Sequence, residues 1–132
     1  MNKANILVTG GLGYIGSHTS VELINNGYNV TIVDSLINSE KFILERIEKI
    51  TGEKIPFYQF DITDYKKTTK CFKENNFDFV IHFAALKSVN ESVKYPDKYM
   101  KNNVDSLKNI LKCIKSQNLS GIVFSSSCTV YG

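Results

Sequence analysis

The stretch Ile6-Leu-Val-Thr-Gly-Gly-Leu-Gly-Tyr-Ile-Gly16 places a cluster of glycines directly between an apolar run and a segment of helical period. A tight turn from a buried strand into a helix needs Gly10 or Gly11, and Gly13 lacks the β-carbon that would block the approach of a diphosphate. Gly16 lets the helix pack close to the strand. The stretch therefore predicts the first turn of a dinucleotide-binding sheet.

The same turn offers hydrogen-bond donors to an anion. Free N–H groups at Tyr14 and Ile15, together with the positive end of the helix dipole, favour a diphosphate. A glycine motif alone occurs by chance, and an ordinary glycine-rich turn is the alternative. Here, however, the motif closes an apolar run, opens a helical segment and is followed by an acid at the end of the next apolar run, and this context favours the dinucleotide.

Asp34 is that acid, 18 residues after Gly16. A carboxylate at the end of the second strand can accept hydrogen bonds from both hydroxyls of the adenosine ribose. The 2′-phosphate of NADP would meet a like charge there, and residues 35–40 contain no arginine to compensate. These residues predict NAD as the cofactor. Asp61, followed by Ile62, can reach the adenine in the same way, although a simple loop acid is the alternative for this residue.

Apolar runs and helical segments alternate along the whole chain. Runs rich in Val, Ile and Phe, without polar alternation, predict buried parallel strands at 5–9, 29–34, 56–61, 79–83 and 121–125. Apolar residues at intervals of three and four predict helices at 15–25, 39–50, 64–75 and 97–116. Gly27 and Gly52 follow the first two helices, and Asp64 can cap the third. The pattern predicts an α/β fold, a Rossmann-type doubly wound parallel sheet of about five strands, with residues 1–132 forming one domain or part of one.

Composition narrows the function classes. A chain of 132 residues with 42% hydrophobic content can bury a continuous core. The net charge of +3 is small and scattered, and Arg46 is the single arginine, which argues against nucleic-acid binding. Three cysteines without CxxC spacing argue against a disulfide framework and a metal site. Since no apolar run is long enough for a membrane span or a signal peptide, we expect a cytoplasmic protein.

Five segments together carry a family resemblance. They are Gly10-Gly-Leu-Gly-Tyr-Ile-Gly-Ser-His18, Asp61-Ile62, His82-Phe-Ala-Ala-Leu-Lys-Ser-Val-Asn-Glu-Ser92, Asn102-Asn-Val104 and Phe124-Ser-Ser-Ser-Cys-Thr-Val-Tyr-Gly132. From about Ile6 to Gly132 the chain resembles the UDP-glucose 4-epimerases, which are extended short-chain dehydrogenases/reductases. The His-Phe-Ala-Ala-Leu-Lys segment followed by Glu-Ser is more characteristic of epimerases than of related dehydratases.

The resemblance implies a set of site residues. With the glycines of the turn, the expected cofactor-binding residues are Gly10, Gly13, Tyr14, Ile15, Gly16, Asp34, Asn38, Ser39, Asp61, Ile62, Phe83, Ala84, Ala85, Lys87 (within the run 83–87), Asn102 and Ser125. It also implies that Ser127 is the active-site hydroxyl that bonds the 4-hydroxyl of the sugar, whereas plain turn chemistry is the alternative for this serine cluster. His18 and His82 are interpreted as structural, and Cys128 as packing.

The catalytic base of the resembled family lies in a Tyr-x-x-x-Lys motif, and none of the seven tyrosines has a lysine four residues later. The family inverts C4 of UDP-glucose or UDP-galactose through a transient 4-keto sugar, with the tyrosine as base. Without it, and without most of the sugar site, the 132 residues alone are expected to be inactive. A last strand containing Ile122, Val123 and Phe124 would be an uncovered edge, so the 132 residues alone are also expected to aggregate or to form a homodimer.

Three functions remain open from the sequence. The first is the NAD-binding part of a nucleotide-sugar 4-epimerase with UDP-glucose and UDP-galactose as substrates. The second is a dehydratase or decarboxylase on the same scaffold, although Thr129 and Val130 stand where dehydratases tend to have acidic groups. The third is a non-catalytic NAD-binding module, which the fold alone does not exclude.

Overall fold

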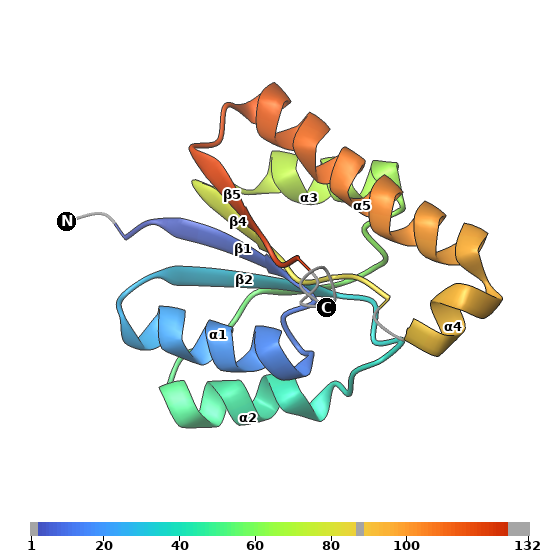
Figure 1. Ribbon diagram of the computed structural model, residues 1–132. Helices are drawn as coiled ribbons and strands as arrows, with labels where there is room; N and C mark the ends of the chain where they lie inside the picture. Colours follow the sequence, from blue (N-terminus) through green and yellow to red (C-terminus); the bar gives the residue numbers. More distant parts are fainter. Residues whose placement is uncertain (1–2, 87–88, 127–132) are drawn as a thin grey trace.

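The computed structural model describes residues 3–86 and 89–126, and a parallel β-sheet lies at its centre (Figure 1). The strands are β1 (Asn5–Thr9), β2 (Asn29–Asp34), β3 (Phe57–Gln59), β4 (Phe79–His82) and β5 (Gly121–Phe124). The helices are α1 (Tyr14–Asn25), α2 (Phe42–Thr51), α3 (Tyr65–Glu74), α4 (Val89–Lys94) and α5 (Pro96–Gln117).

The strand order is β3-β2-β1-β4-β5, and every neighbouring pair is parallel. The chain builds outward from β1 to β3, then crosses back to place β4 on the other side of β1. This is the Rossmann-type order, which confirms the predicted fold class. Thr9 pairs with Val33 of β2 and with His82 of β4, so the carboxyl ends of the three strands meet at one edge. Ligands of such sheets bind at this reversal point.

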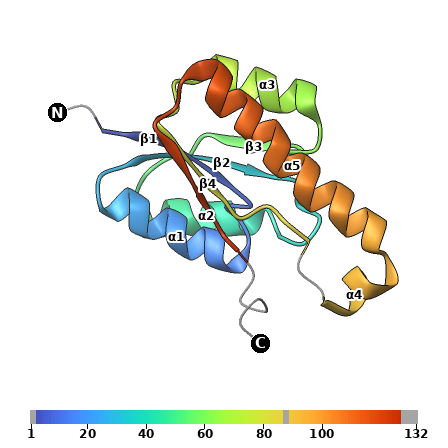
Figure 2. The same cartoon turned by 45° about the horizontal axis from the view of Figure 1, so that its top comes forward.

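Two apolar layers cover the sheet, one on each face. Leu7 of β1 points to the face with Phe72 of α3 and Ile110 of α5. Its neighbour Val8 points to the opposite face, where α1 and α2 contribute Val21 and Ile47. Figures 1 and 2 show α1 and α2 below the sheet and α3 and α5 above it. Because both faces of the central strands are buried, their sequences read as continuous apolar runs.

The predicted element ends differ from the structure mainly around the carboxyl edge of the sheet. The second helix begins at Phe42 rather than at Ser39, because the Ser39 hydroxyl donates to Asp34 Oδ1 at 2.7 Å instead of starting the helix. The third strand ends at Gln59 rather than at residue 61, and Phe60 turns into the apolar core. The short helix α4 was not predicted from the sequence.

The predicted end signals of two helices are confirmed. Asp64 Oδ1 accepts a hydrogen bond from the backbone N of Lys67 at 3.1 Å, one turn into α3. Gly52 ends α2 with φ 73°, a left-handed conformation that favours glycine. None of the helices in the described residues combines the length and apolar character needed to cross a membrane.

Among the described residues, β5 lies at one edge of the sheet and exposes apolar side chains, with Val123 58% and Phe124 50% accessible. Unpaired strand edges of this kind recruit other chains. We expect the 132-residue polypeptide to self-associate in solution and Val123→Lys to shift it toward monomer, measured by light scattering. Ile50→Lys, which removes an equally exposed apolar side chain from α2, is the matched control and should change nothing. A monodisperse wild-type monomer would contradict this prediction.

Candidate functional site

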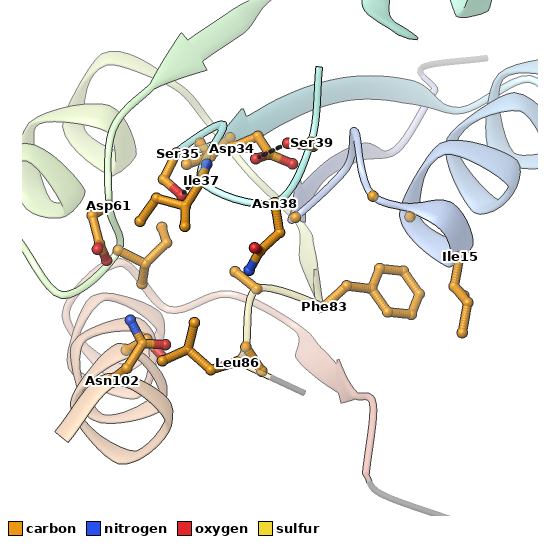
Figure 3. A pocket seen from close by; sticks show the side chains of 18 of the residues that line it. Ile15, Asp34, Ser35, Ile37, Asn38, Ser39, Asp61, Phe83, Leu86 and Asn102 are labelled. Carbon is orange, nitrogen blue, oxygen red and sulfur yellow. Dashed lines mark hydrogen bonds between the residues drawn. The ribbon is translucent and has the colours of Figure 1, made fainter. Parts of the chain in front are cut away.

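A cavity of about 460 Å³ opens at the carboxyl edge of the sheet, where the strand order reverses (Figure 3). Its volume lies within the range of small-molecule sites. It is lined by Gly10, Gly13, Tyr14, Ile15, Gly16, Val33, Asp34, Ser35, Ile37, Asn38, Ser39, Phe60, Asp61, Ile62, Phe83, Ala84, Ala85, Leu86, Glu91, Tyr99, Asn102 and Ser106. In Figure 3, Asp61 and Asn102 lie at one end of the cavity and Ile15 at the other.

At two positions of the glycine turn, a side chain would clash with backbone atoms. Gly10 has φ 65°, and a β-carbon on it would lie 2.8 Å from Ala84 N. The Gly10 amide donates to Val33 O at 2.8 Å, which ties the turn to β2. A β-carbon on Gly16 would fall well inside contact distance of the Gly10 carbonyl oxygen. The turn and the start of α1 therefore approach each other in a way that only glycine allows.

The first turn of α1 presents unpaired N–H groups to the cavity. Gly13 precedes the helix and supplies no side-chain cap, and the first turn contains no acidic residue. The side chains of Tyr14 and Ile15 are exposed, so they leave this helix end open. An open helix N-terminus carries a partial positive charge and favours an anion such as a diphosphate.

Asp34 connects the glycine turn to the loop after β2. It is 7% exposed, and its Oδ2 accepts from the backbone N of Leu12 at 3.0 Å. Its Oδ1 accepts from Leu36 N at 2.9 Å and from Ser39 Oγ at 2.7 Å. A carboxylate offers about four acceptor positions. One position is therefore open to a ligand hydroxyl, and a second opens when Ser39 rotates away.

The loop after β2 takes a shape that the carboxylate supports. Leu36 has φ 64°, an uncommon conformation for a residue with a large side chain. Its side chain packs against the apolar layer on the α1 and α2 face of the sheet, and its amide donates to Asp34. Asn38 then points into the cavity (Figure 3). The strained residue is thus held from two sides, and the following residues reach the site.

Asp61 lines the end of the cavity opposite Ile15 and also holds the turn that follows it in the chain. Its Oδ1 accepts from the backbone N and the hydroxyl of Thr63, both at 2.9 Å. The carboxylate therefore orders the loop after β3 and also lines the cavity. Asp61 is thus a loop acid that also lines the cavity, and its predicted contact with the adenine stays a prediction.

The wall at residues 83–86 is attached to β1 through a buried hydroxyl. Thr9 Oγ1 lies 2.6 Å from His82 Nδ1 and accepts from the backbone N of Phe83 at 3.2 Å and of Ala84 at 3.3 Å. The Thr9 hydroxyl therefore links β1, the His82 ring and the first two residues of the loop after β4. His82, which is 2% exposed, thus belongs to the support of this wall.

Glu91 joins α4 to α5 at the rim of the cavity. It accepts from Lys98 Nζ at 2.6 Å and from the hydroxyl of Tyr99 at 2.9 Å. The hydrogen bond from Lys98, and secondly that from Tyr99, hold the pKa of the Glu91 carboxyl below its usual value. Glu91 therefore stays ionised at neutral pH and anchors the short helix that the sequence did not predict.

The cavity gathers nearly all of the site residues expected from the sequence. Of the described ones, Ser125 is the exception: it does not line the cavity, and its backbone N donates to His82 O at 3.3 Å. Lys87, Ser127 and Cys128 lie outside the described residues. Among residues 3–86 and 89–126, no group of three or more His, Cys, Asp or Glu side chains could hold a metal ion.

Sequence reasoning missed several lining residues: Val33, Ser35, Ile37, Phe60, Glu91, Tyr99 and Ser106. Tyr99 and Ser106 could have been predicted from the sequence as lining residues. They share a helix face with Asn102 at spacings of three and four, so a cavity residue at 102 predicts them. Phe60 and Ile37 could not, because their place depends on where β3 ends and on the conformation of Leu36.

The fold and the site define a dinucleotide-binding class, and the comparison with known families agrees. Residues 6–132 match the model of the NAD dependent epimerase/dehydratase family. The chain belongs to this family.

Individual relatives are similar to the chain over nearly its whole length. The chain is 53% identical over 127 residues to the bifunctional protein GAL10 of Pachysolen tannophilus, covering 96% of this chain and 18% of that protein. It is 50% identical over 132 residues to the UDP-glucose 4-epimerase uge1 of Schizosaccharomyces pombe, covering 100% of this chain and 37% of the relative. The chain thus spans well under half of each of these relatives.

A solved structure shows the same similarity in three dimensions. The UDP-glucose 4-epimerase of Bifidobacterium longum, in complex with NAD+ and UDP, superimposes with a TM-score of 0.95 at 49% sequence identity. The match covers 98% of this chain and 38% of that structure.

Proposed function

We propose that the cavity binds NAD and that the protein carrying this chain is a UDP-glucose 4-epimerase. One observation supports this most directly: the open N-terminus of α1 and the buried Asp34 carboxylate line the same cavity. An anion site beside a hydroxyl-binding acid fits the two ends of an ADP-ribose unit. The bound NAD+ and UDP of the Bifidobacterium longum structure, and the names of the relatives, support the cofactor and the reaction.

On this proposal, different residues of the cavity bind different parts of the cofactor. The amides at Tyr14 and Ile15 bind the diphosphate, and Asp34 accepts the ribose hydroxyls at the acceptor positions left by its internal partners. The end with Asp61, Ile62 and Asn102 takes the adenine. Residues 83–85 form the wall toward the nicotinamide, and Leu86 lies beside Asn102 at the adenine end (Figure 3). By the family resemblance, Lys87 and Ser127 complete the cofactor and sugar sites.

The chemistry of the reaction follows from the family. When bound, NAD supplies a reversible acceptor for the hydride of the sugar C4. Ser127 is proposed to hold the 4-hydroxyl close to the nicotinamide, and a tyrosine outside these residues takes its proton. UDP-glucose and UDP-galactose are the proposed substrates.

A cytoplasmic location and a homodimer are further parts of the proposal. Two cysteines of the described chain, Cys71 and Cys113, are free thiols in the core. Burial is the main cause that raises the pKa of the Cys71 thiol to about 12, so this thiol is unreactive. Free thiols are usual in a reducing compartment. For a homodimer, the exposed apolar side chains on α5, such as Met100 and Leu111, offer contact area.

The test of the cofactor is a calorimetric titration of the purified protein with NAD and with NADP. We expect NAD to bind clearly more tightly, because the 2′-phosphate of NADP would approach the negative charge of Asp34 with no arginine in residues 35–40. Equal affinity for both dinucleotides would contradict the role of Asp34. Binding of neither would contradict the assignment of the cavity.

The test of the reaction uses the full-length protein with UDP-galactose. An epimerase returns UDP-glucose with no net change in redox state. A dehydratase would instead accumulate a 4-keto-6-deoxy sugar, and a non-catalytic NAD-binding module would return the substrate unchanged. Either of the last two results would overturn the proposed reaction while leaving the cofactor site intact.

A further inference from the structure

The face of α5 that lies against the protein carries polar side chains beside the apolar Ile110 and Cys113. Tyr99, Asn102, Asn103, Ser106 and Asn109 fall within roughly 120° of the helix surface at about 100° per residue. Tyr99, Ser106 and Asn109 are buried. A helix face turned toward the core is normally apolar, and buried polar groups need hydrogen-bond partners. The hydrogen-bond partners of these side chains indicate the role of this helix face.

Asn109 holds the loop after β3. Its Nδ2 donates to the backbone carbonyls of Ile62 at 2.8 Å and of Thr63 at 3.1 Å. The side chain is 8% exposed, so these bonds form away from water. Ile62 and its neighbour Asp61 line the cavity. Asn109 itself does not line it, and it acts on the site through this loop.

Asn103 holds the loop after β4, six residues earlier on the same helix. Its Oδ1 accepts from Leu86 N at 2.9 Å, and its Nδ2 donates to Leu86 O at 3.1 Å. One carboxamide thus satisfies both polar groups of one backbone residue. Leu86 lines the cavity, whereas Asn103 does not.

The two loops have no direct link through the sheet. In the strand order β3-β2-β1-β4-β5, two strands separate β3 from β4. Helix α5 bonds to both loops, to one through Asn103 and to the other through Asn109. These two residues are separated by about 9 Å along the helix axis. Ser106, between the two attachment points, and Asn102, one residue before the first of them, line the cavity. The helix therefore sets the distance between two walls that the sheet does not tie together.

We infer that Asn103 and Asn109 are positioning residues, through which α5 fixes the width of the cavity end that receives the base of an adenine dinucleotide. The inference rests on the proposed NAD binding. The end in question contains Asp61, Ile62 and Asn102, and both walls of it are held by carboxamides on one rigid helix. A ligand base inserted between these walls needs them at a fixed separation.

The experiment measures ligand affinity for Asn103→Ala and Asn109→Ala in the full-length protein by calorimetry. The ligands are NAD, ADP and nicotinamide mononucleotide. We expect each variant to bind NAD and ADP about tenfold more weakly, since a released wall must be ordered again when the base binds. Affinity for nicotinamide mononucleotide should stay as in the wild type, because its binding does not involve this end.

Two further variants separate positioning from stability. Asn75→Ala removes another carboxamide, which donates to Cys71 O at 2.8 Å and to the Tyr58 hydroxyl at 3.1 Å away from the cavity. It should lower the unfolding temperature but leave all three affinities unchanged. Asn103→Asp keeps the size and the acceptor for Leu86 N, so it should retain more affinity for ADP than Asn103→Ala does.

The possible results lead to different conclusions. Wild-type affinity for NAD and ADP in both folded alanine variants would overturn the inference. An equal loss for nicotinamide mononucleotide would overturn it as well, because it would indicate general loosening. If the wild-type protein binds neither NAD nor ADP, the proposed function fails first, and the inference falls with it.

Discussion

Replacing Gly10 by alanine is expected to weaken NAD binding by at least about tenfold and to lower the unfolding temperature of the protein markedly. Two effects add at this residue. Its φ of 65° strains any residue with a β-carbon, at about 1–2 kcal/mol. The new methyl group would also lie 2.8 Å from Ala84 N and 2.9 Å from Phe83 C, and overpacking against backbone costs about 1–3 kcal/mol.

The cavity changes because the clash can be relieved only by moving backbone. Phe83 and Ala84 form the wall that Thr9 holds, and both line the cavity together with Gly10. A shift of this wall alters the site itself rather than a distant support. Calorimetry with NAD, together with thermal unfolding in the absence of ligand, measures both consequences.

Gly52→Ala is the matched control. Gly52 has φ 73°, so the backbone strain is similar, but no atom lies within 4 Å of the added β-carbon. This variant should lose stability from the strain alone and keep its affinity for NAD. Equal effects of the two substitutions on NAD affinity would show that the contact with Phe83 and Ala84 does not matter for the site.

The sequence was most informative where local and tertiary requirements coincide. The run 5–9 was predicted as a buried strand because Ile6, Leu7 and Val8 are consecutive apolar residues. Gly10 follows this strand with φ 65°, a conformation that glycine adopts readily. Asp34 stands at the end of a strand, so its position followed from the strand itself. These residues define the cavity, and for this reason most of its lining could be predicted.

The remainder depends on contacts between distant segments. Residue 39 reads as a helix start, but its hydroxyl is used by Asp34, which delays the helix. Helix α4 has six residues, too few to be stable alone, and forms with Glu91 held by Lys98 and Tyr99. β5 ends at Phe124 rather than at the predicted residue 125, and Ser125 donates its backbone N–H to His82 O of β4 and does not line the cavity. No local pattern carries this information.

Asp34→Ala is expected to have the second large effect, and it should change both affinity and selectivity. The substitution leaves the backbone N–H groups of Leu12 and Leu36 without their acceptor, and each unsatisfied buried donor costs about 1–3 kcal/mol. The glycine turn and the loop after β2 lose their common attachment. We expect NAD affinity to fall about a hundredfold, because both loops must be ordered again on binding.

Asp34→Ala should also reduce the selectivity for NAD over NADP. Removing the carboxylate also removes the like charge that disfavours the 2′-phosphate, so NADP loses less affinity than NAD does. The ratio of the two dissociation constants should therefore move toward one. Calorimetric titration of the variant with NAD and NADP measures this ratio directly.

Asp64→Ala separates this effect from the loss of any carboxylate. Asp64 also accepts a backbone hydrogen bond, from Lys67 N at 3.1 Å, but it caps α3 and does not line the cavity. Its loss should cost about 1 kcal/mol of stability, as for other helix caps, and leave the NAD to NADP ratio unchanged. If Asp34→Ala kept the wild-type ratio while losing affinity for both dinucleotides, the carboxylate would only support the loops, and NAD selectivity would have to arise elsewhere in the cavity.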